Sequence, residues 1–600
     1  MKPSDYSTLT RTLVDVAMGR KPADLVVRDG TWVCVQSGEL IPNCDVAVVN
    51  GRVAYVGGDA SHTLGPKTQV INAAGRYLVP GLLDAHMHVE SGMLTVTEFV
   101  RAVVPHGTTG MFIDPHEIAN VFGLKGVRLM VDEAALQPIH VWVQMPSCVP
   151  SAPGFETPGA SLGPDEVAEA MTWEGVIGLG EMMNFPGVFN SDEKMHAEMA
   201  ETRAARKVIG GHYASPDLGL PFHGYVAGGA EDDHEGTRLE DAVARVRQGM
   251  KPMLRFGSAW HDVAEQVRAI TELKLDSRRF ILCTDDAHSA TLIGEGHVNR
   301  ALKQAIAQGL PPMTAIQMAT INAAEHFGVT RDVGMIAPGR FADILIVSNL
   351  PQFQIDMVIS QGRLAALGGR LLLDPPVFTY PEWATNSVHL GHPLSAEDFR
   401  LALPYPQVAV ASVKANVIGV IENQAPTQRL SLDAPVVDGA VQPDLAHDLA
   451  KIALVERHRG TGRVQVGLVH GFGFNVPCAI GSTVAHDSHQ MIVVGTDDAD
   501  MALAANELAR IGGGQVVIRQ GEVIGAVNLP IAGLMSNERA EVVARKAGTV
   551  LYGFRACGCN LNNPNMQLSL MALVVIPELR ISDLGLVDVT QFKFIPVIES

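Results

Sequence analysis

The sequence predicts an α/β protein built on a (β/α)8 TIM-like barrel, flanked by a small β-sandwich and followed by a C-terminal α+β domain. Three observations predict this class. Short apolar runs that end at polar residues alternate with stretches of helical spacing. Strand-and-turn segments of one kind lie on both sides of that region, and the pattern changes again after about residue 375. Because 600 residues exceed what one hydrophobic core accommodates, several domains are expected.

The flanking segments predict one sandwich made from both sides of an inserted barrel. A helix-like stretch, "TLTRTLVDVAMGRKP", precedes "ADLVVRDGTWVCV", "CDVAVVNGRVAYVG" and "TQVINAAGRYLVP". Asp29-Gly30 and Asn50-Gly51 are hairpin turn signals between these segments. A similar piece returns at "GRFADILIVSNL", residues 339–350. We therefore expect the first part of the sandwich within residues 1–76 and the second within 336–374.

The barrel is expected over residues 77–335. Its eight strand candidates are separated mostly by helical stretches such as "VTEFVRAVVPHG" and "DVAEQVRAITEL", and the sixth is rich in Gly and Asp. The candidates are "LVPGLLD" (78–84), "TTGMFID" (108–114), "IHVWVQM" (139–145), "VIGLGE" (176–181), "KVIGGH" (207–212), "GGAEDDH" (228–234), "KPMLRFGS" (251–258) and "FILCTDD" (280–286).

The last predicted domain covers residues 375–600. The Pro-rich "LLLDPPVFTYPEW" reads as a linker into it. β-rich segments such as "VQVGLVHGFGF" and "HQMIVVGTDD" follow, with one helix at "DADMALAANELARI" and a hairpin at "GGGQVVIRQGEVIGAVNLP". This mixture predicts an α+β fold.

Charge and composition argue against two classes of binding partner. A formal net charge of −19, pI ≈ 5.5 and 5% aromatic residues argue against a nucleic-acid or membrane-surface binder. The start of the chain has no secretion signal and no apolar stretch approaches a membrane span, so we expect a cytoplasmic protein. The seven cysteines have no framework spacing and are expected to be reduced, with Cys557 and Cys559 as small buried residues.

Histidines and acids stand at the ends of the predicted barrel strands. His86 and His88, in "GLLDAHMHVESG", are two residues apart and project to one side of an extended chain. If the barrel closes, further candidates reach the same mouth, namely Glu181, His212, His234 and Asp285. Imidazole and carboxylate without thiolate suit Zn, Fe or Mn, so two divalent ions are expected, with Glu181 bridging them. Asp285 is a candidate to relay a proton.

Other polar residues lie nearby in this arrangement. Glu90 could face a substrate or orient a histidine. "DPHEIANV" supplies Asp114, His116 and Glu117, for which a substrate-binding or supporting role and a helix N-terminus are both open. In the last domain we expect His470, His486 and His489 to pack or to make a lid contact, with a third metal site as the alternative.

These motifs resemble the amidohydrolase superfamily, and "HMHVESG", "DPHEIANV", "GEMMNFPGV", "EDDHEG", "CTDDAH" and "LPIAGLMS" are similar to the bacterial adenine deaminases from about residue 20 into the C-terminal domain. The resemblance implies the hydrolysis of adenine to hypoxanthine and ammonia by a metal-bridged hydroxide that attacks C6. It also implies two Mn or Fe ions, with Zn possible, and a homodimer in purine salvage or degradation. The ligands carried over are His86, His88, Glu181, His212, His234 and Asp285. Glu90 or Glu117 would protonate N1, and Glu90, His116 and Glu117 would contact the substrate.

One departure and two alternatives bear on this expectation. Many superfamily members bridge their metals with a carboxylated lysine, whereas the fourth strand here offers Glu181 and no lysine nearby. The P-C-x-x-C motif of the zinc nucleobase deaminases is also absent from the sequence. The alternative enzyme is an amidohydrolase that cleaves a cyclic or linear amide, such as an N-acyl amino acid or a hydantoin-like ring. A catalytically inactive binding protein is the alternative from another class, and the intact ligand set argues against it.

Overall fold

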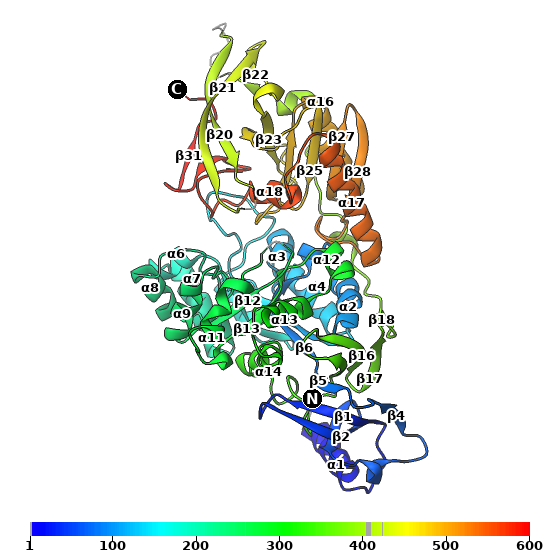
Figure 1. Cartoon of the computed structure of the whole chain (residues 1–600). Coiled ribbons are helices and arrows are strands. Elements are labelled where there is room, and N and C mark those ends of the chain that lie inside the picture. Colours follow the sequence, from blue (N-terminus) through cyan, green and yellow to red (C-terminus); the bar gives the residue numbers. More distant parts are fainter. Residues whose placement is uncertain (1–2, 259, 404–409, 423, 600) are drawn as a thin grey trace.

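The computed structural model describes residues 3–258, 260–403, 410–422 and 424–599. Figure 1 shows three stacked regions: a β-rich unit near the N-terminus, a central α/β unit and a β-rich C-terminal unit that covers the opposite side of the centre. The N-terminal helix α1 (Pro3–Ala17) packs on the first unit, as its sequence predicts. Among the described residues, no helix is both long enough and apolar enough to cross a membrane.

The central unit is the predicted barrel. Its strands pair in parallel in chain order, and β14 returns to β6 through Asp285 opposite Met87, which closes one seam. At the other seam the amide of Glu231 donates to the carbonyl of Ile209 at 2.9 Å. The described strands are β6 (Leu82–His88), β7 (Thr108–Ile113), β8 (His140–Met145), β9 (Val176–Met182), β10 (Val208–Gly211), β11 (Asp232–Asp233), β12 (Lys251–Arg255), β13 (Ile281–Cys283) and β14 (Asp285–Asp286).

The barrel helices follow the amphipathic stretches of the sequence. In α2 the side chain of Thr95 caps the first turn by accepting from the amide of Glu98, and the buried residues of the helix are mostly apolar. The helix predicted in "DVAEQVRAITEL" is instead two short ones that meet at Val267. The outer helices include α2 (Val96–Val103), α3 (His116–Phe122), α4 (Leu124–Ala134), α5 (Pro164–Ala170), α7 (Glu193–Ala204), α8 (Leu220–Gly228), α9 (Leu239–Arg247), α10 (Val263–Gln266), α11 (Arg268–Thr271), α12 (Ser289–Gly294) and α13 (Val298–Ala307).

Three predicted barrel strands differ from the structure, and the eighth, 280–286, is divided into β13 and β14. The first predicted strand, 78–84, is divided: residues 78–80 belong to β5 (Tyr77–Pro80) of the flanking sheet, and the barrel strand β6 begins at Leu82. Because β6 extends through His88, both histidines lie within it rather than after it. The sixth strand is only Asp232–Asp233, because Gly229, at φ +123°, ends helix α8 just before it. The Gly- and Asp-rich sequence there lacks the β-branched residues that favour a longer strand.

Both flanks of the barrel contribute to one sheet. Strand β15 pairs antiparallel with β5, and a bridge between Arg52 and Phe341 brings the β3 edge to the segment before β15. The sheet thereby encloses a core in which Val27 and Val48 pack with Ile344. Its strands are β1 (Leu25–Cys34), β2 (Glu39–Val49), β3 (Arg52–Gly57), β4 (Gln69–Asn72), β5 (Tyr77–Pro80), β15 (Ile344–Asn349), β16 (Gln354–Ser360), β17 (Arg363–Leu367) and β18 (Arg370–Leu371).

One predicted turn in this sheet is confirmed and the other is wrong. Asn50 and Gly51, at φ +50° and +75°, form the two-residue loop between β2 and β3. Asp29-Gly30 lies inside β1, where the register with β2 shifts. The Asp29 amide donates to Asp45 Oδ1 at 3.0 Å, so the pair forms a bulge that a tertiary contact stabilises.

The C-terminal unit has the predicted α+β character. Helix α16 (Asp498–Ile511) and the β27–β28 hairpin lie where the sequence predicts them. Helices α17 (Ala540–Ala556) and α18 (Pro564–Leu570) also pack in this unit. Its main sheet contains β19 (Leu401–Ala402), β20 (Ser412–Val420), β21 (Thr427–Val437), β22 (Ala440–Val441), β23 (Leu449–Val455), β24 (Val464–His470), β25 (Cys478–Ser482), β26 (Met491–Gly495), β27 (Gly514–Arg519) and β28 (Glu522–Asn528). All seven cysteines of the chain are buried free thiols, as expected.

Candidate metal centre and active site

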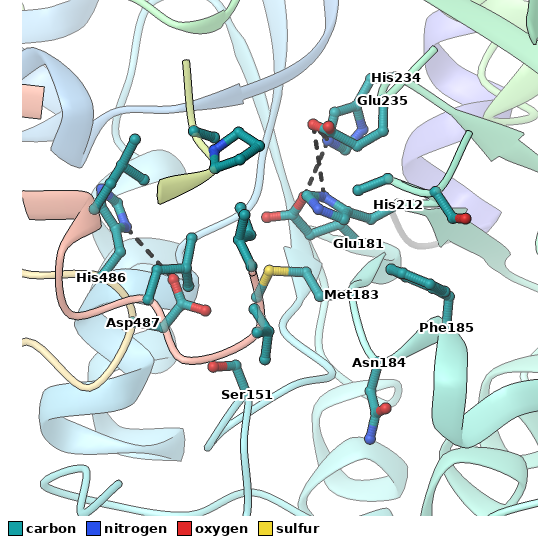
Figure 2. Close-up of a pocket in the computed structure, with 18 of the residues that line it drawn as sticks. Ser151, Glu181, Met183, Asn184, Phe185, His212, His234, Glu235, His486 and Asp487 are labelled. Carbon is teal, nitrogen blue, oxygen red and sulfur yellow. Dashed lines mark hydrogen bonds and ion pairs between the residues drawn. The ribbon is translucent and has the colours of Figure 1, made fainter. Parts of the chain in front are cut away.

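A cavity of about 710 Å³ lies at the carboxyl ends of the barrel strands (Figure 2). Residues of the barrel form its floor, and side chains of the C-terminal unit, including His486 and Asp487, form part of its wall. No lysine is among the described residues that line it. Barrel active sites occupy this face because the loops after the strands converge there.

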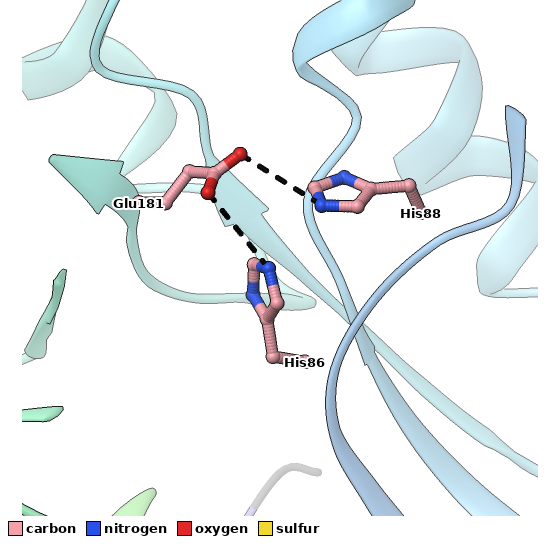
Figure 3. Close-up of side chains that lie close together, drawn as sticks. All are labelled: His86, His88 and Glu181. Atoms are coloured by element: carbon pink, nitrogen blue, oxygen red, sulfur yellow. Dashed lines mark ion pairs between the residues drawn. The ribbon is translucent and has the colours of Figure 1, made fainter. Parts of the chain in front are cut away.

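The strand β6 presents its two histidines to this cavity side by side. Alternation along the strand turns His86 and His88 to one face and Met87 to the other. Figure 3 shows both rings directed at Glu181, which lies near the end of β9. His88 Nε2 is 3.7 Å from Glu181 Oε1, and His86 Nε2 is 4.0 Å from Oε2. One carboxylate thus faces both imidazoles.

Two further histidines approach the same carboxylate. His212 follows β10 and its Nδ1 is 2.5 Å from Glu181 Oε2. His234 follows β11 and its Nε2 is 3.0 Å from that oxygen. The rings of His86 and His234 stack with centroids 3.9 Å apart. Glu181 is therefore surrounded by the four histidines that the sequence singles out.

Asp285 closes the set from β14. Its Oδ1 lies 3.3 Å from His88 Nε2 and 3.9 Å from His86 Nε2. Its Oδ2 accepts from Arg255 Nη1 at 2.9 Å. Asp285 has φ +60°, a backbone conformation that non-glycine residues rarely adopt and that is common at functional sites.

The chemistry of this set fits divalent metal ions. His86 Nε2 is buried with no hydrogen-bond partner in the described structure, a costly state for a polar atom. Burial, with His234 and His88 nearby, lowers the pKa of His86 well below its ordinary value, so its ring is the neutral imidazole that ligates metals. Ligand atoms of His86, His88 and Glu181, and those of Glu181, His212 and His234, lie within 4.8 Å of one another. The site thus has the donors of a divalent-metal centre.

The three residues expected to contact substrate divide between two cavities. His116, at the start of α3, lines the cavity of the metal centre, with Nδ1 3.2 Å from Glu181 Oε1. Glu90 and Glu117 line a neighbouring cavity instead. Burial raises the pKa of Glu90 to about 7, and burial together with the adjacent Glu90 raises the pKa of Glu117 well above its ordinary value. This pair therefore holds a proton at neutral pH.

Sequence reasoning missed Arg255 and Glu235. Arg255 ends β12 and is fully buried, yet it contacts three carboxylates, Asp285, Asp262 and Glu235. Glu235 Oε1 also lies 3.6 Å from His234 Nε2. The sequence did contain a signal for Arg255, because it is a lone arginine at the end of the apolar run "KPMLRF". A charged residue in a buried strand needs a partner of opposite charge.

Asp114 has a supporting position. Its Oδ2 accepts from the amide of Glu181 at 2.8 Å, and its carbonyl accepts from His88 Nδ1 at 2.8 Å. These bonds fix the backbone at Glu181 and the ring of His88. They leave His88 Nε2 free to face the metal centre. In the C-terminal unit, His486 lines both cavities, whereas His470 ends β24 and is not among the described residues of either wall.

Comparisons with known proteins agree with this architecture. The amidohydrolase family matches residues 77–365, and the adenine deaminase C-terminal domain matches residues 424–593. An adenine deaminase from Mesorhizobium japonicum is 62% identical, over 99% of this chain and 97% of its own. Adenine deaminase 3 from Rhizobium meliloti is 60% identical over 99% of both chains, and an adenine deaminase from Moorella thermoacetica is 51% identical over 98% of both. The resemblance seen in the sequence is confirmed: the chain belongs to the adenine deaminase family of amidohydrolases.

Proposed function

We propose that this protein catalyses the hydrolytic deamination of adenine, which gives hypoxanthine and ammonia. The observation that carries the proposal is the convergence of four imidazoles and two carboxylates at the barrel mouth of a chain from this family. An inactive binding protein would not need the complete set. The full-length identity to adenine deaminases favours this substrate over the cyclic or linear amides considered from the sequence.

We assign two divalent ions, Mn or Fe, to the centre. His86, His88 and Asp285 would hold one, His212 and His234 the other, and Glu181 would bridge them. Imidazole and carboxylate donors without thiolate support these metals, with Zn as a further candidate. Bound divalent ions supply a nucleophile by lowering the pKa of water toward neutrality.

The residues of the chain supply proton transfer and orientation. As the oxygen of water bonds to C6 and the C6–amine bond breaks, Asp285 accepts a proton from the attacking water and delivers it to the departing ammonia. The hydrogen bond from Arg255 keeps one Asp285 oxygen turned away and leaves the other facing the histidines.

N1 must gain a proton, and the pair Glu90–Glu117 carries one at neutral pH. Glu117 Oε2 lies 3.8 Å from His88 Nδ1 and 3.9 Å from His116 Nδ1, so this pair borders the metal cavity, and the second proton of the attacking water restores the one that it gives up. His116 is the candidate to contact the ring in the cavity itself.

The test is ammonia release from adenine by protein purified with added Mn. We expect turnover in the wild type, and in Asp285→Asn a loss of about 10²–10⁴-fold in kcat, with the activity expressed per bound metal ion. Asp132→Asn, an exposed acid that pairs with Arg128 on α4, is the control and keeps full activity. A wild-type protein that binds about two ions per chain yet releases no ammonia would reject adenine as the substrate.

We also propose that the protein acts as a homodimer in purine salvage or degradation, in the cytoplasm. The family supports the pathway, and free buried cysteines are the form expected in a reducing compartment. A mass from light scattering near that of one chain, 64.0 kDa, would reject the dimer.

A further inference from the structure

A loop of the C-terminal unit reaches the cavity of the metal centre. The connection between β25 and β26 contains His486 and Asp487, and both side chains line the cavity (Figure 2). The barrel thus supplies the metal donors, while a separate unit supplies an acid to the same space. Neither the metal centre nor the proton transfers described above use this acid.

The Asp487 carboxylate is buried, and only one of its two oxygens has a polar neighbour placed to pair with it in the part of the chain that the structure describes. The residue is 2% exposed. Its Oδ1 lies 3.5 Å from His486 Nδ1 and 3.9 Å from His116 Nε2, while Oδ2 has no hydrogen-bond partner in the described structure. Although burial raises the pKa of Asp487, His486 and His116 lower it below its ordinary value, so the group is an acceptor-only carboxylate. A buried anionic oxygen without a donor points to a donor on the ligand.

The loop that carries Asp487 is held in place on three sides. Arg457 Nε donates to the His489 carbonyl at 2.6 Å, and His458 Nε2 lies 2.8 Å from the Ser488 carbonyl. Gln490 Nε2 donates to the carbonyl of Thr157, in the barrel, at 2.7 Å. The carboxylate is therefore pre-positioned, and the loop cannot easily turn it toward water.

The imidazole ring of His116 lies between the metal centre and Asp487. His116 spans the gap, with Nδ1 3.2 Å from Glu181 Oε1 and Nε2 3.9 Å from Asp487 Oδ1. With C6 placed at the metal centre, a purine laid along His116 would span the same gap, so that its five-membered ring would approach Asp487. Adenine carries one N–H on that ring, at N9 in its main tautomer, and 9-substituted purines such as nucleosides lack it.

We propose that Asp487 accepts the hydrogen bond of the purine N9–H and so makes the enzyme select free adenine against 9-substituted 6-aminopurines. This inference rests on the proposed deamination of adenine. A site built around a substrate N–H discriminates strongly, because an analogue that lacks it leaves the buried acceptor unpaired. A 9-substituent would also occupy the space that the carboxylate borders.

The test compares kcat/KM for adenine and for 9-methyladenine. In the wild type we expect adenine to be favoured by about 10³-fold or more. In Asp487→Ala, kcat/KM for adenine should fall about 10–100-fold, while 9-methyladenine is unchanged or improved, so the ratio shrinks by at least that factor. Asp487→Asn has the same shape without the charge and should reduce the ratio about 10-fold, which keeps the test valid if the alanine variant does not fold.

Asp500→Asn is the matched control. Asp500 is a buried acid of the same unit, and its two oxygens accept from the amides of Gln520 and Gly521 at 2.9 and 2.8 Å. We expect lower stability but an unchanged substrate ratio. Unchanged ratios in both Asp487 variants would overturn the inference. So would a third metal ion per chain that both variants lose, because His116, His486 and Asp487 would then be its ligands. A wild-type enzyme inactive on adenine would instead reject the proposed function.

Discussion

Arg255 shows how one residue organises the acids of the barrel mouth. Its buried guanidinium donates to Asp285 and Asp262, both at 2.9 Å, and also contacts Glu235. A planar fork can hold several carboxylates in fixed orientations, whereas a lysine ammonium is a single point charge. We therefore expect Arg255→Lys to lower kcat/KM for adenine by about 10–100-fold, with metal content little changed. The control is Arg268→Lys, since Arg268 lies on α11 and forms an ion pair with Glu272 near the surface; this variant should keep full activity. Equal losses of activity in the two variants would contradict a positioning role for Arg255.

Glu198 links the stability of the barrel to pH. It is buried in α7, with both carboxylate oxygens unpaired by hydrogen bonds and Lys194 Nζ 3.7 Å away. Burial raises its pKa to about 8 from an ordinary 4.5, so the folded state keeps a proton that the unfolded state releases. Stability should fall between these two pH values by roughly 1.4 kcal/mol per unit. The Tm of Glu198→Gln should drop less than that of the wild type from pH 5 to pH 8. Glu201→Gln, exposed on the same helix, should behave like the wild type.

At the scale of helices and strands, the sequence predicts those features that depend on residues close together in the chain. Apolar runs with helical stretches between them are enough to place the barrel strands, and Asn50-Gly51 is enough to place a hairpin. The bulge at Asp29-Gly30 was not predictable, because it depends on Asp45, a residue on the neighbouring strand. The extension of β6 through His88 has the same kind of cause, since its last residues pair with β14. The division at residues 76, 335 and 374 stays a prediction.

Arg457 connects elements that are far apart in the C-terminal unit. Its guanidinium is buried and donates to three carbonyls, those of His489, Ser387 and Ala532. Because Arg457→Lys leaves part of this set without a donor, we expect the free energy of unfolding to fall by roughly 2–4 kcal/mol. The loop that carries Asp487 should also loosen, which raises KM for adenine more than it lowers kcat. Arg459→Lys, exposed two residues later, is the control for denaturant unfolding and kinetics. Equal stability of the two variants would contradict the prediction.

At the scale of the whole molecule, the candidate metal ligands were predictable because each lies at the carboxyl end of a barrel strand. When the strands close into a barrel, these ends meet at one face. That single topological premise brings five separated segments to one mouth. The premise carries no information on the C-terminal unit, so the approach of Asp487 to His116 did not follow from any spacing. Nor did it show that Glu90 and Glu117 would line a separate cavity, since the wall between the two cavities includes His486 from the other unit.

The distribution of the candidate ligands over β6, β9, β14 and the ends of β10 and β11 makes metal binding a property of the folded barrel. Ions that bind only the folded state stabilise it by mass action, by about 2.7 kcal/mol when free metal exceeds Kd a hundredfold. We expect removal of metal with a chelator to lower Tm and added Mn to restore it. In His86→Asn, which lacks one donor, the chelator should produce a smaller shift from a lower starting Tm. A chelated protein shown to be metal-free, yet unfolding at the temperature of the loaded one, would contradict the assignment of the four histidines, Glu181 and Asp285 as ligands.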